Sequence, residues 1–171
     1  MKAFKFVPVI LALAAGWSGA HAAADFITIK RTQANLSDPS APQLLLQFTL
    51  PSNLNRSSST SNSAVLDLEA LGVEFNFDEV YVNPPADPIC GDNATDAYQS
   101  ESVGTLLEHD DDNLKYEWAA NHMVFSSALL AAGANTLMIC IRNINGEAGT
   151  SAGNLDDIGV RHLVLHYHTT E

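Results

Sequence analysis

The feature that most constrains this chain is a succession of short apolar runs, each followed by a polar turn segment. Such runs occupy residues 26–31, 44–50, 65–69 and 73–77. Apolar or β-branched side chains recur at about every second position in residues 26–31, 65–69 and 73–77, although residues 64–77 also partly fit a helical repeat. A repeat of two residues places alternate side chains on opposite faces of a strand, whereas a helix requires a repeat near 3.6. Residues 136–142 are almost continuously apolar, which predicts a strand buried within the fold.

The rest of the chain extends the same pattern. Further strands are predicted over residues 80–82, 103–107, 122–125 and 158–167. A single helical turn or tight bend that ends at Gly133 is predicted in residues 127–135. About seven to nine short strands with hardly any helical repeat predict an all-β protein. We therefore expect one domain over residues 23–171, folded as a single antiparallel β-sandwich or jelly roll.

The first 22 residues have the composition of a secretory signal peptide. Lys2 and Lys5 precede an apolar stretch over residues 6–15, and the small-residue triplet Ala20-His21-Ala22 follows. This order of basic, apolar and small residues is typical of a cleaved signal, and the apolar stretch is shorter than the roughly 20 residues that span a bilayer. We expect cleavage after Ala22 and a secreted, periplasmic or extracellular protein.

The sequence has two cysteines, Cys90 and Cys140. In an oxidising compartment a single pair favours a disulfide, and neither cysteine has the C-x-x-C spacing of a redox or zinc motif. The alternative is a pair of unrelated buried thiols. We predict a structural Cys90–Cys140 bridge.

Charge and motifs narrow the function classes. The chain has 8 Lys+Arg against 20 Asp+Glu, a formal charge of -12, which argues against nucleic acid and anionic membrane as partners. The sequence contains no G-x-S-x-G, no H-E-x-x-H and no glycine-rich phosphate loop. These features predict a binding protein and no enzyme.

Residues 129–137 read Leu-Leu-Ala-Ala-Gly-Ala-Asn-Thr-Leu, and this L-L-x-x-G-x-N-x-L pattern resembles the bend of galactose-binding-like jelly rolls. The closing segment, in which Asp156-Asp157 precedes alternating apolar residues up to Tyr167, resembles their final strand. The resemblance covers about the last 50 residues. It implies a carbohydrate-binding-module-type β jelly roll, a fold that also hosts enzyme accessory domains and adhesion domains.

Acidic loops make calcium the expected cofactor. Calcium takes six to eight oxygen ligands from carboxylates, amides and carbonyls on turn-rich backbone. The alternative interpretation is a solvated acidic surface whose charges repel one another. The candidate ligands are Asp156, Asp157, Asp110, Asp112, Asp92 and Asp96, with Asp111 in the same cluster.

Histidines in the last predicted strand offer an alternative metal site. Residues i and i+2 of a strand share a face, so His162, His166 and His168 should lie opposite Leu163, Leu165 and Tyr167. A His-x-His pair with a carboxylate from a neighbouring strand can hold zinc or copper. The simpler interpretation is the solvent side of a strand.

Aromatic residues complete the candidates. Trp118 is the one tryptophan outside the predicted signal peptide, and it could stack on a sugar with help from Tyr116. A half-buried packing role is the alternative. The main hypothesis is therefore a secreted, non-enzymatic carbohydrate-binding module with a structural calcium. A secreted metal-dependent enzyme that uses the histidine face, or a structural or adhesive surface component that binds a neighbouring protein, remains open.

Overall fold

The computed structural model describes residues 22–38, 40–56, 63–74, 77–84, 90, 102–108, 117–143, 145–148 and 155–170. The predicted signal peptide lies outside these residues apart from Ala22, where the first strand begins. Its cleavage and the proposed domain boundaries therefore stay predictions.

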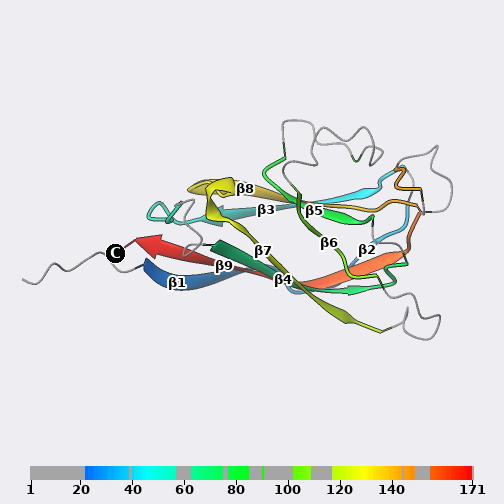
Figure 1. Cartoon of the computed structure of the whole chain (residues 1–171), viewed down its shortest axis with the longest axis horizontal. Coiled ribbons are helices and arrows are strands. Elements are labelled where there is room, and N and C mark those ends of the chain that lie inside the picture. Colours follow the sequence, from blue (N-terminus) through cyan, green and yellow to red (C-terminus); the bar gives the residue numbers. More distant parts are fainter. Residues whose placement is uncertain are drawn as a thin grey trace, which may run out of the picture.

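Two antiparallel sheets pack against each other (Figure 1). One sheet has the order β1-β9-β4-β7, with the short β2 also paired to β9. Its strands are β1 (Ala22–Lys30), β2 (Ala34–Leu36), β4 (Ser63–Leu71), β7 (Ala119–Ser126) and β9 (Ile158–Thr170). The other sheet has the order β3-β8-β5-β6, with strands β3 (Gln43–Leu50), β5 (Glu79–Val82), β6 (Ser102–Thr105) and β8 (Gly133–Cys140).

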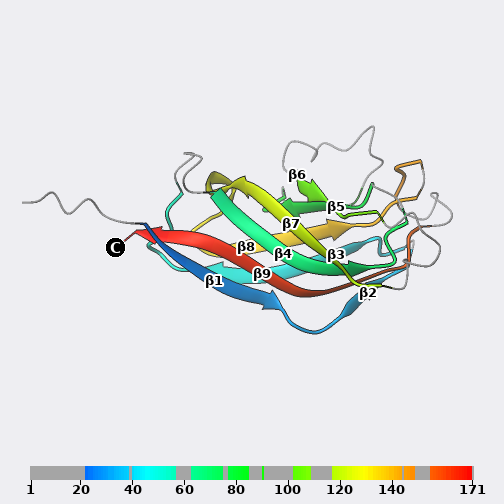
Figure 2. The same ribbon diagram turned by 60° about the horizontal axis from the view of Figure 1, so that its bottom comes forward.

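The strand pairing is that of a jelly roll. With β2 set aside, the first strand pairs with the last, β1 with β9, and the pairing continues inward through β3 with β8 and β4 with β7 to β5 with β6. This nesting wraps one long hairpin into two four-stranded layers, which Figure 2 shows from a second direction. The all-β sandwich or jelly roll predicted from the sequence is confirmed.

Alternation of side chains builds the core between the layers. Along β4 the residues alternate between buried and half-buried, and Leu66 and Leu68 point inward. Residues 137–142 are all buried, so the prediction of a buried strand in this run is confirmed for β8. Burial of apolar area at about 25 cal/mol per Å² is the main contribution that holds the layers together.

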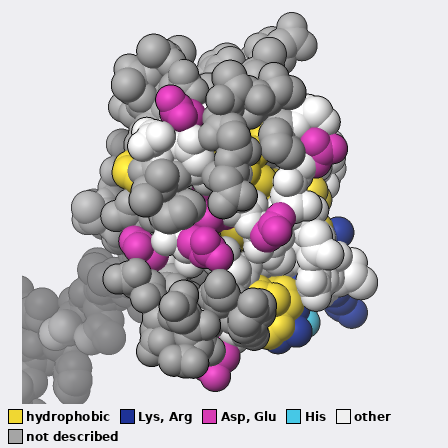
Figure 3. Space-filling model, turned by 90° about the vertical axis from the view of Figure 1, so that its right-hand side faces the viewer, with side chains coloured by type: hydrophobic (Ala, Val, Ile, Leu, Met, Phe, Trp, Pro, Cys, Tyr) yellow, Lys and Arg dark blue, Asp and Glu magenta, His cyan; other side chains and the backbone are white. Residues whose placement is uncertain are grey.

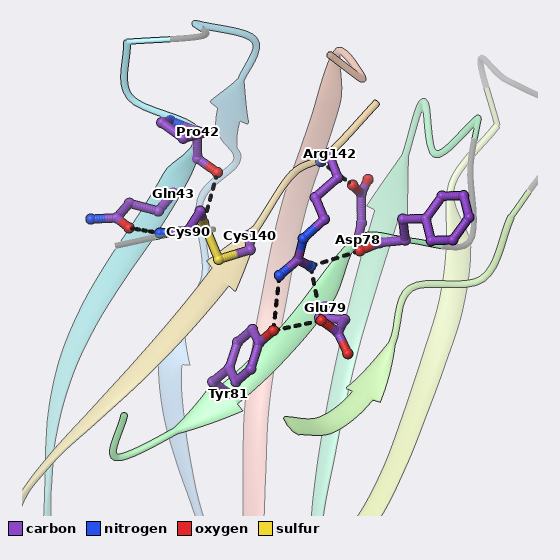
Figure 4. Close-up of a disulfide and its surroundings, with 9 residues drawn as sticks. Pro42, Gln43, Asp78, Glu79, Tyr81, Cys90, Cys140 and Arg142 are labelled. Carbon is purple, nitrogen blue, oxygen red and sulfur yellow. Dashed lines mark hydrogen bonds and ion pairs between the residues drawn. A yellow bond between two sulfur atoms is a disulfide. The ribbon is translucent and has the colours of Figure 1, made fainter. Parts of the chain in front are cut away.

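The disulfide joins Cys90 to Cys140 at the end of β8, with the two Cα atoms 5.6 Å apart (Figure 4). The prediction of this bridge is confirmed. It links residues separated by 50 positions, for which chain entropy gives a stabilisation of about 4 kcal/mol.

The bend before β8 has the predicted form. A 3-10 turn over Ser127–Leu129 is followed by Gly133 in the left-handed region with φ 90°. The buried Asn135 amide fixes the bend, because its oxygen accepts from the Ala131 N–H and its nitrogen donates to the Ala131 and Gly133 carbonyls.

One predicted strand is wrong. The described part of residues 73–77 is not strand, and β4 ends at Leu71. Gly72 has φ 80°, and a Cβ there would lie 2.3 Å from the Asp157 carbonyl oxygen, so the chain turns where only glycine fits. The Glu74 N–H then donates to the Asp156 carboxylate instead of to a neighbouring strand.

Candidate functional site

The histidines of β9 lie on the outer face of the β1-β9-β4-β7 sheet. Leu163, Leu165 and Tyr167 are buried in the core, whereas His162 and His166 are exposed and His168 is half-buried. The alternation shifts by one residue at His162, which has φ 53° and lies in a bulge opposite β4. Because of this bulge, Arg161 is also partly exposed to solvent.

Two carboxylates of β4 hold the imidazoles of this face. Asp67 lies between His122 of β7, 2.5 Å from its Nδ1, and His166 of β9, 3.0 Å from its Nε2. Glu69 lies 3.3 Å from Nδ1 of His162. Of the three predicted metal-ligand histidines, His162 and His166 are therefore bound to different carboxylates, and no carboxylate pairs with His168 in the described residues. Across the described residues, no three His, Cys, Asp or Glu side chains form a group suited to a metal ion.

Trp118 lies on the same face at the end where β7 and β9 begin. It is half-buried, and its Cη2 atom would lie 3.3 Å from a Cβ on Gly159 of β9. Any side chain at residue 159 would therefore crowd the indole. The Arg161 guanidinium lies over one face of the ring, with Cζ 3.8 Å from the ring centroid, a cation–π contact.

Glu69 in turn fixes Arg161. The Arg161 Nε donates to the Glu69 carboxylate at 2.5 Å. This hydrogen bond, with a smaller contribution from His162, lowers the pKa of Glu69 below its usual value of 4.5. Trp118, Arg161 and Glu69 thus form a chain of contacts across β7, β9 and β4.

A pocket of about 270 Å³ lies next to Gly159, the residue against which Trp118 packs. It is lined by β2, the end of β4 and the start of β9, and includes Gln33, Asn35, Asp157 and Gly159. The Gln33 side-chain amide donates to the Asn35 side-chain oxygen at 2.6 Å, and both lie within van der Waals reach of the Gly159 position. We call the group Trp118, Arg161, Gln33, Asn35 and Gly159 the Trp118 patch. It combines an aromatic ring with amide donors and acceptors beside a hollow.

The two aspartates before β9 do not act together. Asp157 is exposed and lines the pocket, whereas Asp156 is buried and faces the buried Asp78. Burial, and then repulsion by Asp156, raise the pKa of Asp78 to about 9. Asp78 is therefore protonated at neutral pH, beside the Asp156 carboxylate.

Next to this pair lies the fully buried Arg142 (Figure 4). Its guanidinium donates to the Phe77 carbonyl, to the Glu79 carboxylate and to the Tyr81 hydroxyl at 2.8 to 3.0 Å. The Arg142 N–H donates to Asp78 at 2.7 Å. This network joins β5, the chain after β8 and the segment before β9, so it supports the elements that carry the pocket.

Sequence reasoning found some of these residues and missed others. Trp118, Asp157 and the β9 histidines were expected at a site, and the structure places Trp118 against Gly159 and Asp157 in the pocket that Gly159 also lines. The missed residues are Gln33, Asn35, Asp67, Glu69, His122 and Arg161. His122 had a usable signal, because the alternation in residues 122–125 puts it opposite the core. The predicted residues Tyr116, Asp92, Asp96, Asp110, Asp111 and Asp112 lie outside the described residues.

Comparisons with known proteins find similar folds among solved structures. No family model and no curated protein matches the sequence. The chain is similar to the structure of BpGH86A, a β-porphyranase of glycoside hydrolase family 86 from the human gut bacterium Bacteroides plebeius, with a TM-score of 0.47 and 12% identity. The match covers 88% of this chain and 21% of that chain, so this chain spans about a fifth of the solved protein. In the described part of the chain, no helix is long and apolar enough to cross a membrane.

Proposed function

We propose that this protein is a non-enzymatic carbohydrate-binding module of an oxidising compartment outside the cytoplasm. The jelly roll supports the proposal, because this architecture is common among lectin domains, although fold alone does not assign a function. The Cys90–Cys140 disulfide supports an exported protein.

The observation that carries the proposal is the Trp118 patch. Sugars present apolar C–H faces and hydroxyl edges, so they are recognised by an aromatic surface next to groups that both donate and accept hydrogen bonds. Arg161 and Gly159 hold the indole in one position, which reduces the entropy lost on binding. Gln33 and Asn35 supply amide donors and acceptors at the pocket.

We also propose that the protein does not catalyse glycoside hydrolysis. Glycoside hydrolysis uses two carboxyl groups, one of them an acid with a raised pKa. On this face Asp67 is paired with two histidines, and Glu69 is paired with Arg161 and has a lowered pKa. Asp78, whose pKa is raised, is buried away from solvent.

The test is binding to a panel of oligosaccharides by the protein without residues 1–22. Trp118→Ala should lose binding by roughly tenfold, because an aromatic contact contributes on the order of 0.5–1.5 kcal/mol beyond the area that it buries. Phe26→Ala is the matched control, since Phe26 is 63% exposed on β1 and pairs in register with His166, far along β9 from the patch. Equal losses in both variants, or no binding by the folded protein, would contradict the proposal.

We also propose that the protein binds calcium and that Asp157, which is exposed at the pocket, is one of the ligands. A bound calcium should raise the melting temperature relative to chelator at fixed ionic strength, by mass action. Asp157→Asn should remove that increase, and Asp38→Asn, an exposed aspartate on another loop, should leave it unchanged. An identical melting temperature with calcium and with chelator would exclude the calcium site.

A further inference from the structure

We infer that the Trp118 patch selects acidic saccharides, those that carry a carboxylate or a sulfate group. The inference rests on the proposed function and adds the substrate class. Its basis is the distribution of positive charge, the strand register and the hydrogen-bond donors of Arg161.

Positive charge gathers at one end of an acidic chain. The whole sequence has a formal charge of -12, and the described residues include five Lys and Arg side chains. Arg142 is fully buried, and Arg56 lies beside Leu54, which bridges to Thr169 at the far end of β9. The other three, Lys30, Arg31 and Arg161, belong to the end of β1 and the start of β9.

The strand register brings these three cations together. Lys30 pairs with Leu163, and Ala34 pairs with Val160. The segment 31–33 between them therefore runs along the backbone of Arg161 and His162, which puts Arg31 at the same end of β9 as Arg161. Figure 3 looks at this end of the molecule, and Lys or Arg and His side chains border hydrophobic atoms at its lower right edge.

Arg161 keeps donors for a ligand. Its Nε is bound to Glu69, and no described residue accepts a hydrogen bond from its two terminal nitrogens. Its side chain is 32% exposed. A guanidinium held through Nε offers its terminal N–H groups in a fixed plane, a geometry that suits the oxygens of a carboxylate or sulfate.

The acids around the patch define where the anionic group binds. Glu69 is neutralised by Arg161 and His162, while Asp157 lies in the pocket that Gly159 also lines. A carboxylate or sulfate is therefore favoured beside Arg161 and Arg31 and disfavoured next to Asp157. The sugar ring of the same ligand would contact Trp118 and reach the amides of Gln33 and Asn35.

The experiment compares saccharides that differ in charge alone. Polygalacturonate oligosaccharides are measured against their methyl esters, and dextran sulfate against dextran, by calorimetry at low and at physiological salt. The acidic member of at least one pair should bind about tenfold more tightly, because hydrogen bonds to charged groups contribute on the order of 1.5–3 kcal/mol each. The advantage should shrink as salt approaches about 0.15 M. The carboxylate and sulfate pairs show which anion is preferred.

Variants assign the preference to the patch. Arg161→Gln and the double variant Lys30→Gln/Arg31→Gln should each reduce the advantage of the acidic ligand at least about threefold while melting normally. Arg56→Gln is the control of equal charge change, since Arg56 is exposed and lies near the other end of β9. A loss as large in Arg56→Gln would overturn the inference by showing that only net charge matters.

The outcomes separate the inference from the proposed function. Binding that depends on Trp118 but is equal for acidic and neutral partners would overturn the acidic preference and support the carbohydrate-binding function. Binding of no saccharide by the folded protein would overturn both. Acidic binding that Arg161→Gln and Lys30→Gln/Arg31→Gln weaken, and Arg56→Gln does not, supports both.

Discussion

Two Arg–Glu pairs occur in this molecule in opposite environments. Arg142 and Glu79 meet at 2.9 Å with side chains 0% and 12% exposed, whereas Arg161 and Glu69 meet at 2.5 Å with side chains 32% and 35% exposed. Both arginines belong to one end of the sandwich, after β8 and at the start of β9. The residue types are equal, so the differences between the pairs come from their surroundings.

The surroundings decide how the donors are used. The Arg142 side chain donates to a carbonyl, a carboxylate and a hydroxyl, because a buried guanidinium without partners would be very costly. Arg161 donates to Glu69 through Nε and stacks on Trp118, and water can solvate the rest. The inner pair is therefore structural, whereas the outer pair positions an exposed surface that can bind a ligand.

The largest effect is expected from removing the inner arginine. Arg142→Leu leaves Glu79 without its buried cation and should cost about 3–5 kcal/mol of unfolding free energy. Arg161→Leu removes a partly exposed partner and should cost at most about 1 kcal/mol. Urea unfolding of both variants at pH 7 measures the difference.

Arg142→Lys keeps the charge and serves as a second variant if Arg142→Leu does not fold. A single ammonium replaces the planar donor group, so the unfolding free energy lost in Arg142→Lys should fall between the losses in Arg142→Leu and Arg161→Leu. Similar losses for Arg142→Leu and Arg161→Leu would contradict the distinction between the two pairs.

A smaller effect is expected at Asp78, which lies beside the inner pair. Its carboxyl has a pKa of about 9 in the folded protein and 3.8 as the ordinary value, so folding takes up a proton between these pH values. The folded state is favoured below about pH 4, and its stability falls as the pH rises to about 9. Asp78→Asn removes this proton uptake and keeps a side-chain oxygen that can accept from the Arg142 N–H.

We expect Asp78→Asn to raise the unfolding free energy by at least about 1 kcal/mol at pH 8 and to change it little at pH 3. Melting curves from pH 3 to pH 9 measure the effect. Asp67→Asn, on the exposed face, should show no gain at pH 8 and serves as the control. A wild-type protein with equal stability at pH 5 and pH 8 would contradict the uptake of a proton by Asp78 on folding.

The sequence predicted the layers of this molecule much better than its site. Alternating burial leaves a period of two in strands such as β4 and β7, and the apolar run of β8 is continuous, so strands, inward leucines and outward histidines could be predicted one segment at a time. The disulfide followed from there being two cysteines. These features depend on local pattern and composition.

The site depends on register, which a single sequence does not specify. From the sequence, Asp67 and Glu69 are simply the polar side of a strand. In the structure, the pairing of β4 with β7 and β9 places His122 beside Asp67 and Arg161 beside Glu69. The bulge at His162 has no strong signal, and it decides that Arg161 can reach Trp118. The pairing of Asp78 with Asp156 joins residues far apart in the chain, and their loops gave no sign of it.

The smallest effect, and the sharpest test of the outer pair, is expected at Glu69. Glu69→Gln breaks a bond between side chains that are about one third exposed, so the unfolding free energy should fall by less than about 1 kcal/mol at pH 7. The pKa of Glu69 is lowered in the folded state, so the wild type has this advantage above pH 4.5 and loses it as the pH falls through the folded value. The difference in melting temperature between the two proteins should therefore shrink as the pH falls below 4.5. Trp118 fluorescence should change at pH 7 even though stability barely does, because Arg161 is no longer fixed over the ring. Glu74→Gln, an exposed glutamate outside the sheet, is the matched control. Unchanged fluorescence in Glu69→Gln would show that Glu69 does not position Arg161, and the outer pair would then be no more than a surface ion pair.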